Sequence, residues 1–153
     1  MINTIDYYNK NAKTFIDGTI SVDFKHIQDT FLELLPENAK ILDFGCGSGR
    51  DTKYFLEHGC SVDAMDGSLE LCKAASEYTG INVKNMLFQD LYENEIYDGI
   101  WACASILHVK RDELPEMVLG NYTNRVIEII YILSGQVRNC IEKEIREKNS
   151  MEY

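Results

Sequence analysis

A glycine-rich turn between an apolar run and a helical pattern constrains the fold of this chain more than any other feature. Residues 41–44 read Ile-Leu-Asp-Phe, a run long enough for a buried strand. Glycines follow at every second position, at Gly45, Gly47 and Gly49, and a helical pattern begins at Asp51. Glycine tolerates positive φ and lets a backbone approach a ligand closely. A strand, a glycine turn and a helix N-terminus in this order predict a site for a nucleotide-like ligand.

The bulk composition narrows the class of protein. A length of 153 residues fits a single domain, and a hydrophobic share of 45% argues against disorder. The formal net charge is −10 and no basic stripe is present, which disfavours nucleic acid or an anionic membrane as a partner. The chain shows no signal-peptide pattern and no apolar run near the ~18 residues of a membrane span. We therefore expect a cytoplasmic protein.

The five cysteines point to no metal site and no disulfide framework. Their number is odd, and no two of them are spaced as Cys-x-x-Cys. We expect reduced, mostly buried thiols, as is typical of cytosolic proteins.

The apolar pattern alternates between strands and helices as far as residue 112. We expect strands at 41–44, 61–65, 83–88 and 97–103, and helices at 22–35, at 52–58 and after the capping residue Ser68. Such alternation is typical of a parallel sheet with helices on both faces. The predicted fold is α/β, a Rossmann-like parallel sheet in residues 1–112, with Trp101 in its core.

Aspartates stand at the ends of the first three predicted strands. Asp43 precedes the glycine turn, Asp66 ends the second strand, and Asp90 ends the third. Each alone is more typical of a turn or a helix cap. Because the carboxyl ends of parallel strands meet at one edge of a sheet, the three are expected to converge on one ligand. Asp66 can accept both hydroxyls of a ribose, and Asp90 can accept from an adenine amino group.

Two details of the turn distinguish between cofactor classes. A dinucleotide fingerprint has a third glycine where this chain has Arg50. A carboxylate at Asp43 would repel a pyrophosphate and can hold a cationic amine through a bridging water. These features favour a cofactor with ammonium and sulfonium groups, S-adenosylmethionine, over NAD.

Residues about 5–117 resemble the class I S-adenosylmethionine-dependent methyltransferases, in particular small bacterial members of the tellurite-resistance type or the general methyltransferase-domain type. Residues 41–51, Ile-Leu-Asp-Phe-Gly-Cys-Gly-Ser-Gly-Arg-Asp, match the first motif of that family. Residues 62–68, 88–91 and 97–109 match its second motif, its third motif and its fourth strand with the following loop. Residues 7–15 resemble the N-terminal lid over the cofactor.

The resemblance implies a role for individual residues. Gly45 and Gly47 would approach the methionine part, and residues 102–105 would line the floor near the sulfonium. Tyr8 either covers the cofactor or only packs in the lid, and His108 is either a general base or a packing residue. Because the sulfonium is already activated, alignment dominates catalysis and no catalytic side chain is predicted. The predicted cofactor-binding residues are Tyr8, Lys13, Asp43, Gly45, Cys46, Gly47, Asp66, Gly67, Ser68, Asp90, Leu91, Ala102, Cys103 and Ala104.

The sequence departs from the family pattern after Met117. Apolar residues between Val118 and Ile145 recur at three- and four-residue steps, so we favour a mainly helical tail over 113–148, although residues 126–133 would equally suit a β-branched strand. The Gly-Gly turn and later strands expected of the family are missing, through a frame change, a natural truncation or fragmentation. The fourth strand would then be an apolar sheet edge, which residues 113–153 or a second copy of the chain should cover.

Three functions follow from these observations. The first is methyl transfer from S-adenosylmethionine to a small-molecule acceptor, impaired if the C-terminal strands are lost. The second is a non-catalytic cofactor-binding or dimerising interaction protein derived from such an enzyme. The third, a nicotinamide-dependent oxidoreductase, is disfavoured by the glycine spacing and by Asp43.

Overall fold

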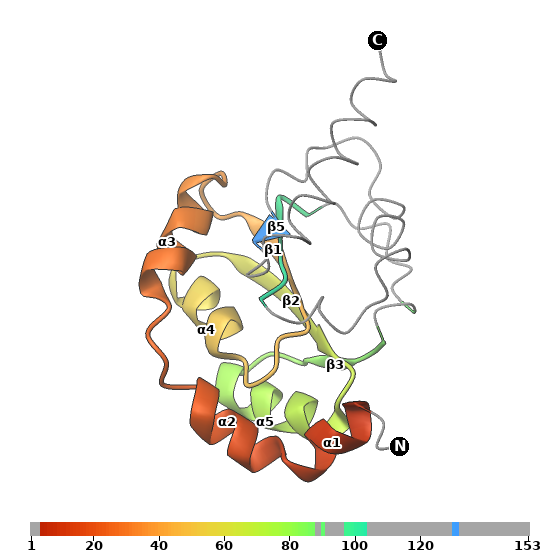
Figure 1. The fold of residues 1–153 in the computed structure, drawn as a ribbon. Helices are drawn as coiled ribbons and strands as arrows, with labels where there is room; N and C mark the ends of the chain where they lie inside the picture. Colours follow the sequence, from red (N-terminus) through yellow and green to blue (C-terminus); the bar gives the residue numbers. More distant parts are fainter. Residues whose placement is uncertain (1–3, 88–89, 91–96, 104–129, 132–153) are drawn as a thin grey trace, which may run out of the picture.

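The computed structural model describes residues 4–87, 90, 97–103 and 130–131. In them a sheet forms with strand order β3-β2-β1-β4-β5, and all neighbouring strands are parallel. The elements, shown in Figure 1, are α1 (Thr4–Lys10), α2 (Ala12–Thr19), α3 (Lys25–Glu33), β1 (Lys40–Phe44), α4 (Arg50–Glu57), β2 (Ser61–Asp66), α5 (Leu69–Thr79), β3 (Lys84–Asn85), β4 (Gly99–Trp101) and β5 (Ile130–Tyr131). The predicted α/β fold with a parallel sheet is confirmed.

β1 lies at the centre of the sheet because it is apolar on both faces. Ile41, Leu42 and Phe44 are 0, 2 and 3% exposed, as expected of a parallel strand that is covered on both sides. β1 pairs with β2 along its whole length and with β4 at residues 41–43. The carboxyl ends of β1, β2 and β4 therefore lie side by side, at the end of the sheet where these strands finish.

An aromatic cluster holds α3 and α4 against one face of the sheet. Phe31 of α3, Phe55 of α4 and Trp101 of β4 have ring centroids 5.0 to 5.4 Å apart, and each is at most 1% exposed. Ile41 and Val62 of the sheet belong to the same core. The prediction that Trp101 is a core residue is confirmed.

α5 packs beside α4 on this face, and the N-terminal helices lie along α5. The hydroxyl of Ser68 accepts a hydrogen bond from the N–H of Leu71, at 3.3 Å, which confirms the predicted N-cap. Cys72 and Ala75 of α5 pack against Ala64 of β2. Figure 1 shows α1 and α2 running alongside α5, near the end of the sheet where β2 and β3 finish.

Some elements are shorter than their patterns predict. The strand expected at 83–88 comprises Lys84–Asn85, and the strand expected at 97–103 comprises Gly99–Trp101. The helix expected at 22–35 begins at Lys25 and ends at Glu33. Val22 and Leu34 lie outside the helix and are 46% and 51% exposed, although their spacing is helical.

The tail contributes a strand, which contradicts two expectations. Ile130–Tyr131 pairs in parallel with β4, with Ile130 opposite Ile100. The preference for helix over 126–133 is therefore wrong at residues 130–131, because β-branched residues suit the pleated sheet as well as a helix face. β4 is consequently not the edge of the sheet at these residues. The remainder of 113–153, including the predicted helix, lies outside the described residues.

Neither a membrane span nor a metal cluster occurs in the described part of the chain. No described helix is both long and apolar enough to cross a membrane. Within the same residues, no three His, Cys, Asp or Glu side chains are grouped as metal ligands would be.

Candidate functional site

The glycine turn after β1 is locked by hydrogen bonds to β2. The N–H groups of Gly45 and Cys46 both donate to the carbonyl of Met65, at 2.9 Å each. Gly45 and Gly47 have φ values of 78° and 56°, a region that glycine reaches without steric cost. Glycine at these two positions therefore allows the chain to turn after β1 and approach the end of β2.

Asp66 joins the first and second motifs. Its Oδ2 accepts from the N–H of Gly47, and its Oδ1 accepts from the N–H of Ser68, both at 2.9 Å. The side chain is partly exposed, so a ligand at this edge of the sheet can reach it. Asp66 thus brings Gly47 and Ser68 together at the carboxyl end of β2. The convergence of Asp43, Asp66 and Asp90 on one ligand stays a prediction.

α2 covers the glycine turn through one aromatic side chain. A Cβ atom on Gly47 would lie 2.9 Å from a ring carbon of Phe15, closer than such atoms come without displacement. Phe15 in turn packs edge-to-face on Tyr8 of α1, with ring centroids 5.3 Å apart. Tyr8 and Phe15 thus form an aromatic cover over the turn.

Tyr8 lies near the carboxylate of Asp66. Burial raises the pKa of the Tyr8 hydroxyl, and the negative charge of Asp66 raises this pKa further. Asn9, the next residue of α1, accepts from the hydroxyl of Ser68 at 2.6 Å and from the N–H of Glu70 at 3.3 Å. Asn9 therefore attaches α1 to the start of α5, a role that the sequence pattern did not reveal.

Asp43 is placed differently from the sequence-based expectation. It is 2% exposed, and its Oδ2 accepts from the hydroxyl of Thr52 at 2.6 Å. Burial and the charge of nearby Asp51 raise the pKa of Asp43 to about 8. The raised pKa favours the protonated form of Asp43, so the argument that its charge repels a pyrophosphate is weaker than the sequence suggests, because burial opposes the ordinary acidity of the carboxyl.

A buried polar cluster, the Asp51 cluster, lies beside Asp43 and comprises Gln28, Arg50, Asp51 and Trp101. Oδ1 of Asp51 accepts from Nε2 of Gln28 at 2.6 Å and from Nε of Arg50 at 3.0 Å. Oδ2 accepts from Nη2 of Arg50 at 3.1 Å and from the indole N–H of Trp101 at 2.9 Å. Asp51 is 6% exposed. Sequence reasoning missed this cluster, because Gln28 and Trp101 lie 23 and 50 residues away from Asp51 in the sequence.

The other predicted site residues fall into three groups. Cys46 and Ala102 are buried near the ends of β1 and β4, with Cys103 partly buried. Lys13 and Asp90 are exposed, and the N–H of Asp90 donates to the carbonyl of Leu87 at 3.0 Å. Leu91, Ala104 and His108 lie outside the described residues.

The cysteines near the site are unreactive thiols rather than nucleophiles. Burial raises the pKa of Cys103 to about 11, and it raises the pKa of Cys46 well above its ordinary value. A thiol is nucleophilic as its thiolate, so neither side chain is suited to covalent chemistry at neutral pH.

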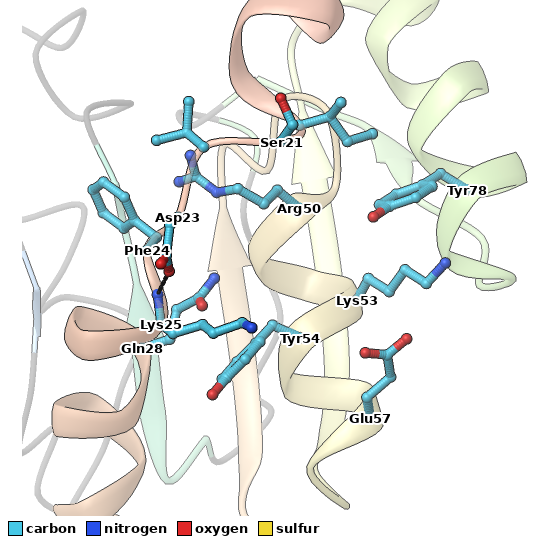
Figure 2. Close-up of a pocket in the computed structure, with 12 residues that line it drawn as sticks. Ser21, Asp23, Phe24, Lys25, Gln28, Arg50, Lys53, Tyr54, Glu57 and Tyr78 are labelled. Atoms are coloured by element: carbon cyan, nitrogen blue, oxygen red, sulfur yellow. Dashed lines mark hydrogen bonds between the residues drawn. The ribbon is translucent and has the colours of Figure 1, made fainter.

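A cavity of about 350 Å³ is lined in part by Gln28 and Arg50 of the Asp51 cluster. It is bounded by residues 20–25, by the outer surface of α4 and by Tyr78 of α5; Figure 2 shows Arg50, Lys53 and Tyr78 along its wall. None of the predicted cofactor-binding residues lines this cavity.

Comparison with known families agrees with this geometry. The model of the methyltransferase domain family matches residues 41–123, which contain the glycine turn, Asp66 and β4. The chain belongs to this family. Together with the sheet order, the match confirms the resemblance to class I S-adenosylmethionine-dependent methyltransferases.

Several methyltransferases are similar to this methyltransferase domain. Malonyl-[acyl-carrier protein] O-methyltransferase of Salmonella typhimurium is 32% identical over 101 residues, which are 61% of this chain and 39% of that protein. Sarcosine/dimethylglycine N-methyltransferase of Aphanothece halophytica is 35% identical over 82 residues, 48% of this chain and 30% of that protein. The chain thus spans less than half the length of these two relatives.

A solved structure shares the fold over most of the chain. The TehB-like SAM-dependent methyltransferase from Corynebacterium glutamicum has a TM-score of 0.68 and 19% identity, covering 92% of this chain and 82% of that one. At this identity the likeness concerns the fold of the methyltransferase domain.

Proposed function

We propose that the protein binds S-adenosylmethionine at the glycine turn and transfers its methyl group to a small-molecule acceptor. The observation that carries the proposal is the position of Asp66. Its partly exposed carboxylate is joined to the backbone of Gly47 at the carboxyl end of β2, in a chain of the methyltransferase domain family. Ligands of open parallel sheets bind at this end of the strands.

The hydrogen bonds of the turn suit a cofactor that carries no phosphate. A pyrophosphate binds to backbone N–H groups of a glycine turn that point at the ligand. Here the N–H groups of Gly45 and Cys46 donate to Met65, and that of Gly47 donates to Asp66. This arrangement supports S-adenosylmethionine over NAD, and it replaces the charge argument that Asp43 does not sustain.

In this proposal the chain binds and orients its ligands. Asp66 accepts from the ribose hydroxyls, Asp90 accepts from the adenine amino group, and the backbone of Gly45 and Gly47 lies against the methionine part. Tyr8 and Phe15 cover the turn and exclude water. The sulfonium of the cofactor supplies the activated methyl group, so alignment contributes most to the rate and no acid or base is required of the protein.

The alternative is a protein that binds the cofactor without turnover. It is favoured by the expected departure from the family pattern in the tail, where the family match ends at residue 123. In that case we propose a homodimer or another interaction role for residues 113–153. A methyl-release assay over a broad panel of acceptors separates the alternatives: turnover supports the enzyme, and tight binding with no turnover on any acceptor supports the binding protein.

Calorimetry tests the choice of cofactor. S-adenosylmethionine and its demethylated product, S-adenosylhomocysteine, should each bind one site per chain, and NAD should produce no heat of binding. Binding of NAD in place of both sulfur compounds would contradict the proposal and restore the nicotinamide-dependent oxidoreductase.

A further inference from the structure

The Asp51 cluster lies beside β1 and β4, where the strand order changes direction: β2 and β3 lie on one side of β1, and β4 and β5 lie on the other. From β1 the chain continues to β2 on one side, whereas β4 lies on the other side. The topological switch point therefore lies between the ends of β1 and β4, and sheets of this kind bind their ligands in a crevice at that point. Asp51 belongs to the helix that follows β1, and it accepts from the indole N–H of Trp101, the last residue of β4. Its carboxylate thus connects the two walls of this crevice.

Arg50 extends the cluster to two further segments. Its Nη1 donates to the carbonyl of Thr19 at the end of α2, at 3.3 Å, and its Nη2 lies 3.9 Å from Sγ of Cys103, just after β4. The guanidinium also lies over the ring of Phe24, 4.3 Å from its centroid. Because Arg50 donates two hydrogen bonds to Asp51, the carboxylate fixes the guanidinium and, through it, these contacts.

The cluster is more than a neutralising ion pair. One arginine is sufficient to balance the charge of Asp51, yet two uncharged donors from α3 and β4 also reach the same carboxylate. A buried carboxylate with several donors allows little displacement of any of them, because each lost hydrogen bond exposes a desolvated charge. Such a cluster keeps the elements that supply the donors at a fixed separation.

We propose that Asp51 is a positioning residue for the cofactor site, which holds the end of β4 and the residues after it at a fixed distance from the glycine turn. This inference rests on the proposed function, since it assumes that the crevice between β1 and β4 receives the cofactor. Asp51 does not itself touch the cofactor in this account. It acts through Trp101, which precedes Ala102 and Cys103 in the chain.

The cluster offers a matched pair of variants. Trp101→Phe removes the donor from β4, which borders the cofactor site, and Gln28→Met removes the donor from α3, which does not. Both remove one hydrogen bond to Asp51, so a merely structural role predicts similar consequences for binding. Phe55→Leu is the control for lost aromatic volume. The ring centroids of Phe55 and Trp101 are 5.1 Å apart, and the Phe55 side chain has no hydrogen-bond donor for Asp51.

The experiment measures the Kd of S-adenosylhomocysteine by calorimetry for the full chain and the three variants, together with their thermal unfolding. We expect the Kd to rise about tenfold in Trp101→Phe and less than about threefold in Gln28→Met and Phe55→Leu, because only the first loosens a wall of the crevice. All three variants should unfold at lower temperature. Equal Kd values in Trp101→Phe and Gln28→Met would overturn the inference while leaving the proposed function intact. If the unaltered chain does not bind S-adenosylhomocysteine, both fail.

A second measurement needs no variant. Trp101 is the only tryptophan, so its indole N–H gives a single signal in the NMR spectrum of the unaltered protein. The inference predicts slow exchange of this proton with solvent and a shift of its signal when S-adenosylhomocysteine binds. Binding that leaves the signal unchanged would overturn it.

Discussion

Two carboxylates near the carboxyl ends of the strands, Asp66 and Asp51, are held in contrasting ways. Asp66 is partly exposed and accepts from backbone N–H groups of its own loop and of the glycine turn. Asp51 is buried and accepts from side chains of three different elements. The contrast separates an acid that a ligand can reach from an acid that holds the surrounding elements together. Both lie at or after the end of a strand and within two residues of a glycine in the sequence, and only their surroundings in the fold distinguish them.

The largest expected effect of this contrast is on stability. Asp51→Leu should lower the free energy of unfolding by about 3–5 kcal/mol, because it leaves the partly buried Arg50 charge and the buried N–H groups of Gln28 and Trp101 without their acceptor. Asp66→Leu should cost clearly less, since solvent can reach the groups that it leaves unpaired. Urea denaturation of both variants gives the comparison, and equal losses would show that the two carboxylates do not differ as described.

Cofactor binding should depend on the carboxylate of Asp66, which a ligand can reach. Asp66→Ala should weaken binding of S-adenosylhomocysteine by about 2–3 kcal/mol, because two hydrogen bonds to the ribose are lost. Asp63→Ala is the matched control: Asp63 also lies on β2, but it accepts from the hydroxyl of Tyr97, away from the glycine turn. An unchanged Kd in Asp66→Ala would mean that the ribose is placed wrongly.

The glycine turn should tolerate no side chain at Gly47. Gly47→Ala forces a positive φ on alanine and brings its Cβ against Phe15, so we expect a loss of about 1–2 kcal/mol in unfolding free energy. Gly18→Ala is the control, because Gly18 is helical and has no atom within 4 Å of an added Cβ; it should stabilise the protein slightly. Thermal unfolding of the two variants should therefore shift in opposite directions.

The smallest predicted effect is the change in stability that Asp43 contributes over one pH unit near neutrality. The pKa of Asp43 is about 8 in the folded protein, against an ordinary value of 3.8. The folded state therefore holds a proton that the unfolded state has released, and stability falls as the pH rises from the lower to the higher of these values. Between about pH 6.5 and 7.5 the loss should be about 1 kcal/mol. Asp43→Asn should lack this slope, and identical slopes in the two proteins would contradict a protonated Asp43.

The elements that sequence patterns predicted best are those determined by neighbouring residues. Strand β1, the turn at Gly45 and Gly47, and the cap at Ser68 all follow from local spacing and residue type. The Asp51 cluster and the contact of Asn9 with Ser68 depend on residues that only folding brings together, so no local pattern announces them. Residues 126–133 illustrate a third case, because their β-branched run suits helix and strand equally, and pairing with β4 decides in favour of a strand at Ile130–Tyr131.

The protonation of Asp43 was also beyond the reach of the sequence. Its position before the glycine turn suggested a carboxylate facing a ligand. Whether such a group is charged depends on its burial and on the neighbouring charge of Asp51, and neither is visible in a linear pattern. The glycine spacing still favoured the same cofactor, because it reflects the course of the backbone rather than the charge state of one group.

A crystal structure of the protein with S-adenosylhomocysteine tests the central claim most directly. The account predicts the ribose hydroxyls within about 2.6–3.2 Å of the Asp66 carboxylate, with the homocysteine part against Gly45 and Gly47. A ligand bound instead in the cavity beside Lys53 and Tyr78, or with its ribose away from Asp66, would contradict it.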